Sequence, residues 1–286
     1  REFPAVAVIV AESNQVTIYD GDDPIMPMWM VFETNASDMI ASGILSLTML
    51  NGVLAVGRNT PLHVINFVSD GHTSYTPTSR NSYLGAIGQR NSGLGVSANL
   101  GTPYVVANVG NDVAMTVLPN APIDAATGLP VPTIAVATAG GTSVIRDDGT
   151  VVDVMAGTNA YGVEFTKDYK LLHTANDANS TFSIHVRSIP SSDTTAPASR
   201  KYNHDGGGGF TTPPISGISN ESTSKKLAIL PNHTIASATL GSSTTGGKPA
   251  LNLLQEVASE PTKGMVAYTT STYNTGWMNG AIKLAT

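Results

Sequence analysis

The chain of 286 residues contains no cysteine and few charged residues. Without cysteine, no disulfide framework, thiolate metal site, iron–sulfur cluster or cysteine nucleophile can form. Charged residues make up 13% of the chain, which is about half of the usual share in globular proteins. The formal net charge is −6. Because nucleic-acid binding requires a concentrated basic surface, this composition argues against it.

Long apolar runs and helical periodicity are also missing. No apolar run approaches the roughly 18 residues of a transmembrane helix, so we expect no membrane insertion. Glycine or proline interrupts almost every window that could form an amphipathic helix. Residues 251–257 fit either a short helix or a strand. Since the chain starts at Arg1 and residues 280–286 form no cap, we expect an internal segment of a longer polypeptide.

Strand signals are present along the whole chain, in groups that are separated by turns rich in Gly, Asn, Asp and Pro. The expected groups are 4–11, 16–19 and 28–32; 44–50, 53–57 and 62–68; 112–118, 133–138, 143–146 and 150–154; 162–166, 170–175 and 181–189; and 226–230, 234–239 and 250–257. The inner strands are continuous apolar runs, which indicates that both faces of each sheet are buried.

Repetition of one small antiparallel sheet predicts an all-β fold, a β-propeller of about five blades. A sixth blade is possible if residues 79–109 form one. The segments 265–270 and 274–278 look like strands with no following blade. We therefore expect the C-terminal strand to pair beside residues 5–11 and close the ring. A β-sandwich and a β-helix are the alternative folds.

We expect a single domain over residues 1–286, with polar inserts at about 70–110 and 190–222. Both inserts are rich in Ser, Thr, Gly, Asn and Tyr, which make adaptable contacts of low charge when loops lie on a rigid scaffold. Solvated connections are the alternative role. The candidate binding residues of these inserts are Tyr75, Tyr83, Tyr104, Tyr202, His204 and Phe210.

Asp20, Asp22 and Asp23 lie within one predicted turn and are the candidate ligands for a hard cation such as calcium. The Glu at the twelfth position of an EF-hand is missing, and an ordinary Asp-Gly turn is the alternative. The six histidines form no HxH or HExxH motif. We therefore expect no resident cofactor.

Enzymatic carboxylates are the remaining possibility that the sequence raises. Glycosidases built on propellers use two or three carboxylates that project into the axial cavity. Glu12, Asp112 and Glu164 lie near predicted strands, but no pattern pairs them. A Gly-x-Ser-x-Gly nucleophile elbow is absent. We therefore predict no catalytic residue.

Six runs carry a family resemblance: 1–11, 16–24, 111–124, 134–138, 144–151 and 273–280. They resemble runs in large virion proteins of marine and environmental tailed phages, in which this stretch looks like a propeller-like module of a longer chain. The resemblance implies a non-enzymatic structural or adhesive part of the particle, in a tail, fibre or appendage. The implied partners are other virion proteins, copies of the same chain, and a host-surface glycan or receptor.

Two other functions stay open at this point. A carbohydrate-active propeller enzyme, such as a depolymerase, would need paired carboxylates in an axial pocket. A secreted or surface adhesion protein of a cell would share the fold and differ only in its origin.

Overall fold

The computed structural model describes residues 3–60, 62–97, 100–155, 157–176, 182–196, 198, 200–203, 223–230, 234–240, 250–255, 265–270 and 280–284. Over these residues the chain is all-β, apart from the 3₁₀ helix η1 (Ile87–Gln89). The strands form five antiparallel sheets, and each sheet consists of strands that are consecutive in the sequence. No helix in this part of the chain has the length and apolar character needed to cross a membrane.

We number the sheets in chain order. The first sheet contains β1 (Ala7–Glu12), β2 (Gln15–Asp20) and β3 (Met28–Glu33). The second contains β4 (Ile44–Leu50), β5 (Val53–Arg58), β6 (Leu62–Asn66), β7 (Gly71–Tyr75) and β8 (Arg80–Asn81). The third contains β9 (Gly110–Thr116), β10 (Thr133–Thr138), β11 (Gly141–Ile145) and β12 (Val151–Val154).

The fourth sheet contains β13 (Ala160–Phe165), β14 (Leu171–Asn176), β15 (Phe182–Arg187) and β16 (Arg200–Asn203). The fifth contains β17 (Thr223–Ile229), β18 (Thr234–Leu240), β19 (Ala250–Gln255), β20 (Met265–Thr270) and β21 (Gly280–Leu284). All five strand groups expected from the sequence therefore appear as sheets.

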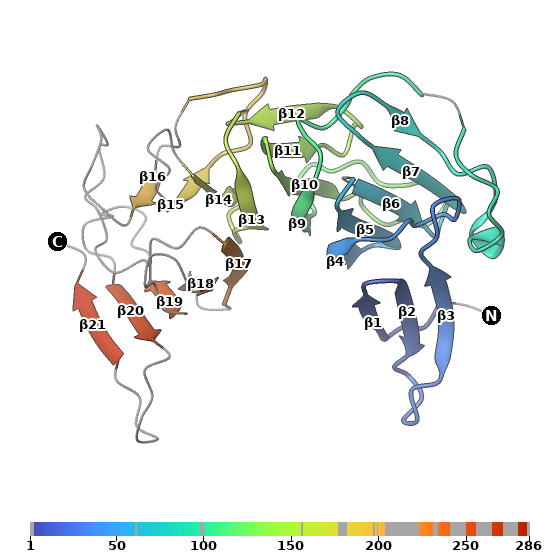
Figure 1. Ribbon diagram of the computed structural model, residues 1–286, viewed down its shortest axis with the longest axis horizontal. Helices are drawn as coiled ribbons and strands as arrows, with labels where there is room; N and C mark the ends of the chain where they lie inside the picture. Colours follow the sequence, from blue (N-terminus) through green and yellow to red (C-terminus); the bar gives the residue numbers. More distant parts are fainter. Residues whose placement is uncertain are drawn as a thin grey trace.

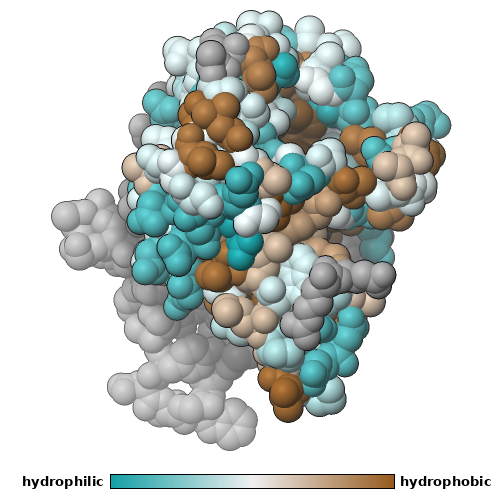
Figure 2. All heavy atoms as spheres, turned by 90° about the vertical axis from the view of Figure 1, so that its right-hand side faces the viewer, coloured by the Kyte–Doolittle hydropathy of each residue, from teal (hydrophilic) through white to brown (hydrophobic). Residues whose placement is uncertain are grey.

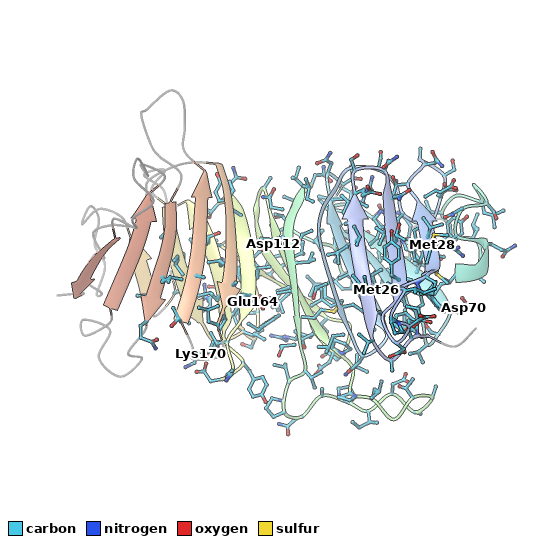
Figure 3. All side chains as sticks on the ribbon, turned by 90° about the horizontal axis from the view of Figure 1, so that it is seen from below. Met26, Met28, Asp70, Asp112, Glu164 and Lys170 are labelled. Carbon is cyan, nitrogen blue, oxygen red and sulfur yellow. The ribbon has the colours of Figure 1, made fainter. Side chains whose placement is uncertain are left out.

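The five sheets follow one another along an arc, with the first and the fifth sheet at its two ends (Figure 1). The first strands of successive sheets contact each other, since β9 packs against both β4 and β13, and β13 packs against β17. These strands form the inner side of the arc, which Figure 3 shows from below. Side chains on neighbouring inner strands therefore come from distant parts of the sequence.

Each pair of neighbouring sheets shares a hydrophobic core, because middle strands bury both of their faces. In β5, Leu54 and Val56 pack toward the first sheet, whereas Val53 and Ala55 pack toward the third. All six residues of β5 and all six of β10 are buried. The continuous apolar runs predict this two-sided burial, whereas a strand with one solvent-exposed face would alternate apolar and polar residues.

One expectation about the ring is wrong for the described residues. Residues 265–270 form β20, which pairs with β19 and β21, and β1 pairs with β2. The C-terminal strand therefore extends its own sheet, because a consecutive strand is the nearest pairing partner. Residues 274–278 lie outside the described residues. The described part of 79–109 forms no sheet of its own, since β8 belongs to the second sheet.

Residues 251–257, which fit a helix or a strand, begin within the strand β19. The expected insert at 70–110 contributes β7, β8 and η1, and most of its other described residues lie in turns and loops. The insert at 190–222 contributes β16, and residues 204–222 lie outside the described part of the chain.

Candidate functional site

The inner side of the arc carries a buried carboxylate that joins three sheets. Asp112 on β9 is 7% exposed. Its Oδ1 accepts a hydrogen bond of 2.7 Å from the Ser46 hydroxyl on β4, and its Oδ2 accepts one of 3.2 Å from the Val163 amide on β13. Hydrogen bonds to a charged acceptor are stronger than neutral ones. Asp112 thus ties the second, third and fourth sheets together.

Glu164 on β13 follows the residue that Asp112 binds. Burial raises the pKa of Glu164, and the nearby charge of Asp112 raises it further, while a hydrogen bond from the Phe165 amide (3.0 Å) lowers it. Figure 3 shows Asp112 and Glu164 in the central part of the arc. Glu12, in contrast, lies on β1 and accepts a hydrogen bond from Gln15. Of the three carboxylates considered from the sequence, two are therefore neighbours.

Two histidines of the second sheet form a buried hydrogen-bonded pair. The Tyr83 amide donates to His72 Nδ1 (3.1 Å), so the neutral His72 ring carries its proton on Nε2, which lies 2.7 Å from His63 Nδ1. His63 also lies beside Arg58 and the Met39 carbonyl. Burial lowers the pKa of His72 to about 4 and that of His63 well below its usual value. Both rings are therefore neutral at pH 7.

The fourth sheet contains a second pair in a similar arrangement. His173 on β14 lies directly opposite His185 on β15, with ring centroids 5.1 Å apart. Thr142 Oγ1 lies 3.3 Å from His173 Nδ1, and Ser183 Oγ lies 3.0 Å from His185 Nε2. Burial lowers the pKa of His173 to about 3. His173 is therefore neutral at pH 7 within the core of the fourth sheet.

The three aspartates of the predicted turn bind backbone amides. Asp22 accepts hydrogen bonds from the Ala5 amide (2.7 Å) and the Val6 amide (3.1 Å), which attaches the start of the chain to this turn. Asp20 and Asp23 each accept one from an amide two residues further on. Within the described ranges, no three His, Asp or Glu side chains lie close enough together to hold a metal ion.

The candidate binding residues of the first insert are mostly buried. Tyr83 is 6% exposed and packs in the core between the first and second sheets, where its hydroxyl donates to the Gln89 carbonyl. Tyr75 on β7 packs beside the core between the second and third sheets, and burial raises its pKa. Both rings therefore serve internal packing.

The other candidates can be placed only in part. Tyr104 is partly buried. Tyr202 lies on β16 opposite Ile184, and its side chain is outside the described part. His204 and Phe210 lie outside the described residues.

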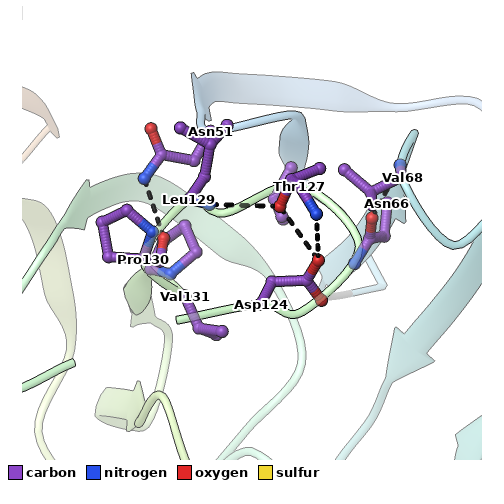
Figure 4. Close-up of a pocket in the computed structure, with 10 residues that line it drawn as sticks. Asn51, Asn66, Val68, Asp124, Thr127, Leu129, Pro130 and Val131 are labelled. Atoms are coloured by element: carbon purple, nitrogen blue, oxygen red, sulfur yellow. Dashed lines mark hydrogen bonds between the residues drawn. The ribbon is translucent and has the colours of Figure 1, made fainter. Parts of the chain in front are cut away.

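A pocket lies between the hairpin ends of the second sheet and the 117–132 loop, which joins β9 to β10. It is an open hollow, and the space of about 280 Å³ between its lining atoms includes open solvent. Its polar lining residues are Asn51, Asn66, Asp124 and Thr127, and its apolar ones are Val53, Val68, Leu129, Pro130, Val131 and Pro132. In Figure 4, Asn51 and Pro130 lie on one side of the pocket, and Asp124 and Asn66 on the other.

Sequence reasoning missed this pocket, although its local signals are visible. Asn51–Gly52 is a hairpin turn with both residues at positive φ (49° and 75°). Asp124 and Thr127 have the spacing at which a carboxylate accepts hydrogen bonds from amides two and three residues ahead. What no local pattern shows is that residues 51, 66 and 124 meet in space.

No protein-family model matches the chain, and no curated protein sequence matches it. Among solved structures, the computationally designed Ika8 protein aligns over 99% of this chain and 85% of its own, with 10% identity and a TM-score of 0.39. A Bacteroides caccae protein of unknown function aligns over 96% and 93%, with 10% identity and a TM-score of 0.37. Kluyveromyces lactis Hsv2 aligns over 97% and 93%, with 11% identity and a TM-score of 0.26. Similarity this low carries no argument about fold or function.

Proposed function

We propose that the five sheets are the blades of a β-propeller, and that this propeller is a non-enzymatic structural and adhesive module of a phage particle. The observation that carries the proposal is the Asp112 carboxylate, which is buried on the inner side of the arc and accepts bonds from two other sheets. A charged group used in this way holds consecutive sheets at a fixed spacing. Rigidity of that kind suits a scaffold.

The surface supports a role in assembly. Hydrophilic and hydrophobic atoms are interspersed on the side that carries β3 and the 80–100 loop (Figure 2). The only ion pair within 4.0 Å among the described residues joins Lys170 and Asp168. A neutral, mixed surface favours contacts through shape and hydrogen bonds, as in non-obligate protein interfaces. The partners we propose are other virion proteins, copies of the chain, and a host-surface glycan or receptor.

Location in the particle tests the phage role directly. Purified phage particles that encode this chain should contain it by mass spectrometry, and antibodies against the folded chain should label one part of the particle in electron micrographs. Recovery of the chain only from cell supernatant or cell surface, with particles free of it, would favour a cellular adhesion protein instead.

Substitution of Asp112 tests the scaffold. Asp112→Asn removes the negative charge and leaves one oxygen acceptor, so the hydrogen bonds from the Ser46 hydroxyl and the Val163 amide cannot both be kept as they are. We expect a loss of about 1–3 kcal/mol in the free energy of unfolding. Ser46→Ala removes only the hydroxyl bond and should cost less, about 1 kcal/mol. Urea unfolding measures both variants. If the free energy of unfolding is unchanged in both, Asp112 does not link the sheets.

Ring closure can be tested because the chain has no cysteine. The first sheet exposes Val8, Val10 and Met28 on its outer face. In the fifth sheet, Ala228 and Leu253 lie on the face opposite the core, in one row through Ala236. A closed propeller would pack these two faces together. Cross-linking of a Val8→Cys, Ala228→Cys double variant should then be intramolecular, and purely intermolecular products would contradict closure.

A carbohydrate-active enzyme is a second candidate, because Asp112 and Glu164 lie together and the pKa of Glu164 is raised. A raised pKa suits a general acid of a glycosidase. If the chain cleaves host polysaccharide, Glu164→Gln should abolish the release of reducing ends. The matched control is Glu12→Gln, which alters an exposed carboxylate of β1. Absence of polysaccharide cleavage by the unaltered chain would eliminate this candidate.

A further inference from the structure

We propose that the pocket lined by Asn51, Asn66 and Asp124 binds one neutral pyranose unit of a saccharide through two adjacent hydroxyl groups. The proposal rests on the adhesive part of the proposed function and places the glycan contact away from both polar inserts. Its basis is a preformed pocket in which one hydrogen-bond donor, Asn66 Nδ2, and one acceptor, Asp124 Oδ2, have no partner among the residues that the structure describes.

The loop that forms one wall of the pocket is held in place by hydrogen bonds. Asn51 Nδ2 donates to the Pro130 carbonyl (2.8 Å), which joins the loop to the hairpin end of the second sheet. Within the loop, the Asp124 amide donates to the Leu129 carbonyl (2.9 Å), and the Gly128 amide to the Asp124 carbonyl (2.8 Å). A ligand would therefore find the wall already formed, which reduces the entropic cost of binding.

Asp124 presents one free carboxylate oxygen. Its Oδ1 accepts three hydrogen bonds, from the Ala126 amide (3.0 Å), the Thr127 amide (3.0 Å) and the Thr127 hydroxyl (2.9 Å). Its Oδ2 accepts none from the described residues. The bonds from Thr127 lower the pKa of Asp124, so the group is ionised at neutral pH. The local turn thus fixes the carboxylate and leaves a charged acceptor for a ligand.

Asn66 supplies the matching donor. Its Oδ1 accepts hydrogen bonds from the Val68 amide (2.9 Å) and the Ser69 amide (3.1 Å), which fixes the side chain. Its Nδ2 donates to no group in the described part of the chain. Adjacent hydroxyls of a sugar are each donor and acceptor, so one can donate to Asp124 Oδ2 while its neighbour accepts from Asn66 Nδ2.

The rest of the lining selects against other ligands. Asp124 is the single ionisable group among the ten lining residues. Its negative charge repels phosphates, sulfates and acidic sugars, and no cationic side chain compensates. A cation would be attracted by the Asp124 carboxylate, but the N–H groups of the Asn66 amide carry partial positive charge and would repel it. The apolar residues, among them Leu129 and Pro130, offer a surface for the C–H face of a sugar ring.

Titration of the full chain with methyl glycosides of glucose, galactose and mannose, followed by NMR, tests the proposal. We expect at least one glycoside to shift the amide signals of residues 124–131 with saturable binding. Asp124→Asn should weaken this binding about tenfold, since it removes the charged acceptor. Asn66→Asp keeps the Oδ1 that holds the turn and loses the donor, so it should weaken binding at least as much.

Asp148→Asn is the matched control. Asp148 is an exposed aspartate outside the pocket, and its Oδ1, like that of Asp124, accepts hydrogen bonds from a nearby threonine amide and hydroxyl, here those of Thr150. It should bind the glycoside as the unaltered chain does. No saturable binding of any neutral glycoside, unchanged binding in Asp124→Asn, or binding of methylammonium instead would overturn the proposal. None of these results depends on whether particles contain the chain, so the two proposals fail separately.

Discussion

At the scale of single residues, burial sets the protonation of the histidine pairs. His72 and His63 share one hydrogen bond inside the second sheet, and His173 lies opposite His185 inside the fourth. Transfer of an imidazole to a dry core disfavours its charged form. The pKa of His72 falls to about 4 and that of His173 to about 3. His72 and His173 are therefore points at which acid can destabilise the fold.

The first prediction concerns the dependence of stability on pH. His72 titrates at about 4 in the folded chain and near 6.5 when unfolded. Between these values the unfolded state binds more protons, so the free energy of unfolding falls as the pH falls. His72 alone should cost about 3 kcal/mol between pH 7 and pH 4.

Urea unfolding at several pH values measures this effect. His72→Asn keeps an acceptor for the Tyr83 amide and removes the titrating group, so stability should fall less steeply between pH 7 and pH 4. The comparison uses the slope of the free energy of unfolding against pH, because the variant also loses packing interactions at pH 7. An identical slope in the variant and the unaltered chain would show that His72 does not titrate as its burial requires.

Single residues also explain why the candidate binding residues and metal ligands were hard to assign from the sequence. Tyr83 lies in a polar stretch, yet it forms a bridge with Val96 and packs in the core. Asp22 lies in a cluster of carboxylates, yet two backbone amides use it as an acceptor. Composition describes a segment, whereas the role of one side chain depends on which distant atoms meet it.

At the scale of elements, the loop at 82–97 takes the place of a fourth strand in the first sheet. The outer strand β3 has no further strand beside it in the described residues. Its edge is covered by side chains: Arg90 and Asn91 donate to the Val31 carbonyl, and the Glu33 amide donates to Asn91 Oδ1 (3.0 Å). Covering an edge in this way prevents pairing with another chain.

The second prediction concerns this edge. Arg90→Ala with Asn91→Ala should expose the β3 edge, lower the free energy of unfolding by about 2 kcal/mol and promote association. Calorimetry and light scattering measure the two effects. Asn91→Asp keeps the acceptor for the Glu33 amide and should have a smaller effect. If the double variant is as stable and as monomeric as the unaltered chain, the 82–97 loop does not protect the edge of β3.

Hairpins were predictable from the sequence because they are local. Asp148–Gly149 and Asn51–Gly52 mark turns between adjacent strands, and each strand pairs with its neighbour in sequence. The partner of 265–270 was not predictable in the same way. Pairing with residues 5–11 would close a loop of most of the chain, and a hairpin with β19 costs far less loop entropy.

At the scale of the whole molecule, close packing between sheets depends on positions without a side chain. Gly57 on β5 faces β9 of the third sheet, and a Cβ placed on it would lie 2.7 Å from the Gly110 carbonyl oxygen and 3.1 Å from Val113 Cγ1. Gly57 also pairs with Ser46, whose hydroxyl reaches Asp112. The missing side chain therefore lets the second and third sheets come close enough for that bond.

The third prediction follows from this packing. Gly57→Ala must push a backbone oxygen of β9 away, and overpacking of this kind costs about 1–3 kcal/mol. Gly88→Ala is the matched control, because a Cβ at Gly88 meets no atom within 4 Å. It should leave stability unchanged or raise it by about 0.5 kcal/mol, through a less flexible unfolded chain.

Urea unfolding separates the two outcomes and also reports how the sheets cooperate. Each sheet shares a core with the next, so we expect the sheets to unfold in one common transition. Gly57→Ala should move this transition to a lower urea concentration. The shift should be the same by far-UV circular dichroism and by tryptophan fluorescence. The experiment uses a Trp277→Phe background, in which Trp29 is the single tryptophan of the sequence and reports on the first sheet, two sheets away from β9. If the fluorescence transition stays in place while the circular dichroism transition moves, the sheets unfold independently and the scaffold is not one rigid unit.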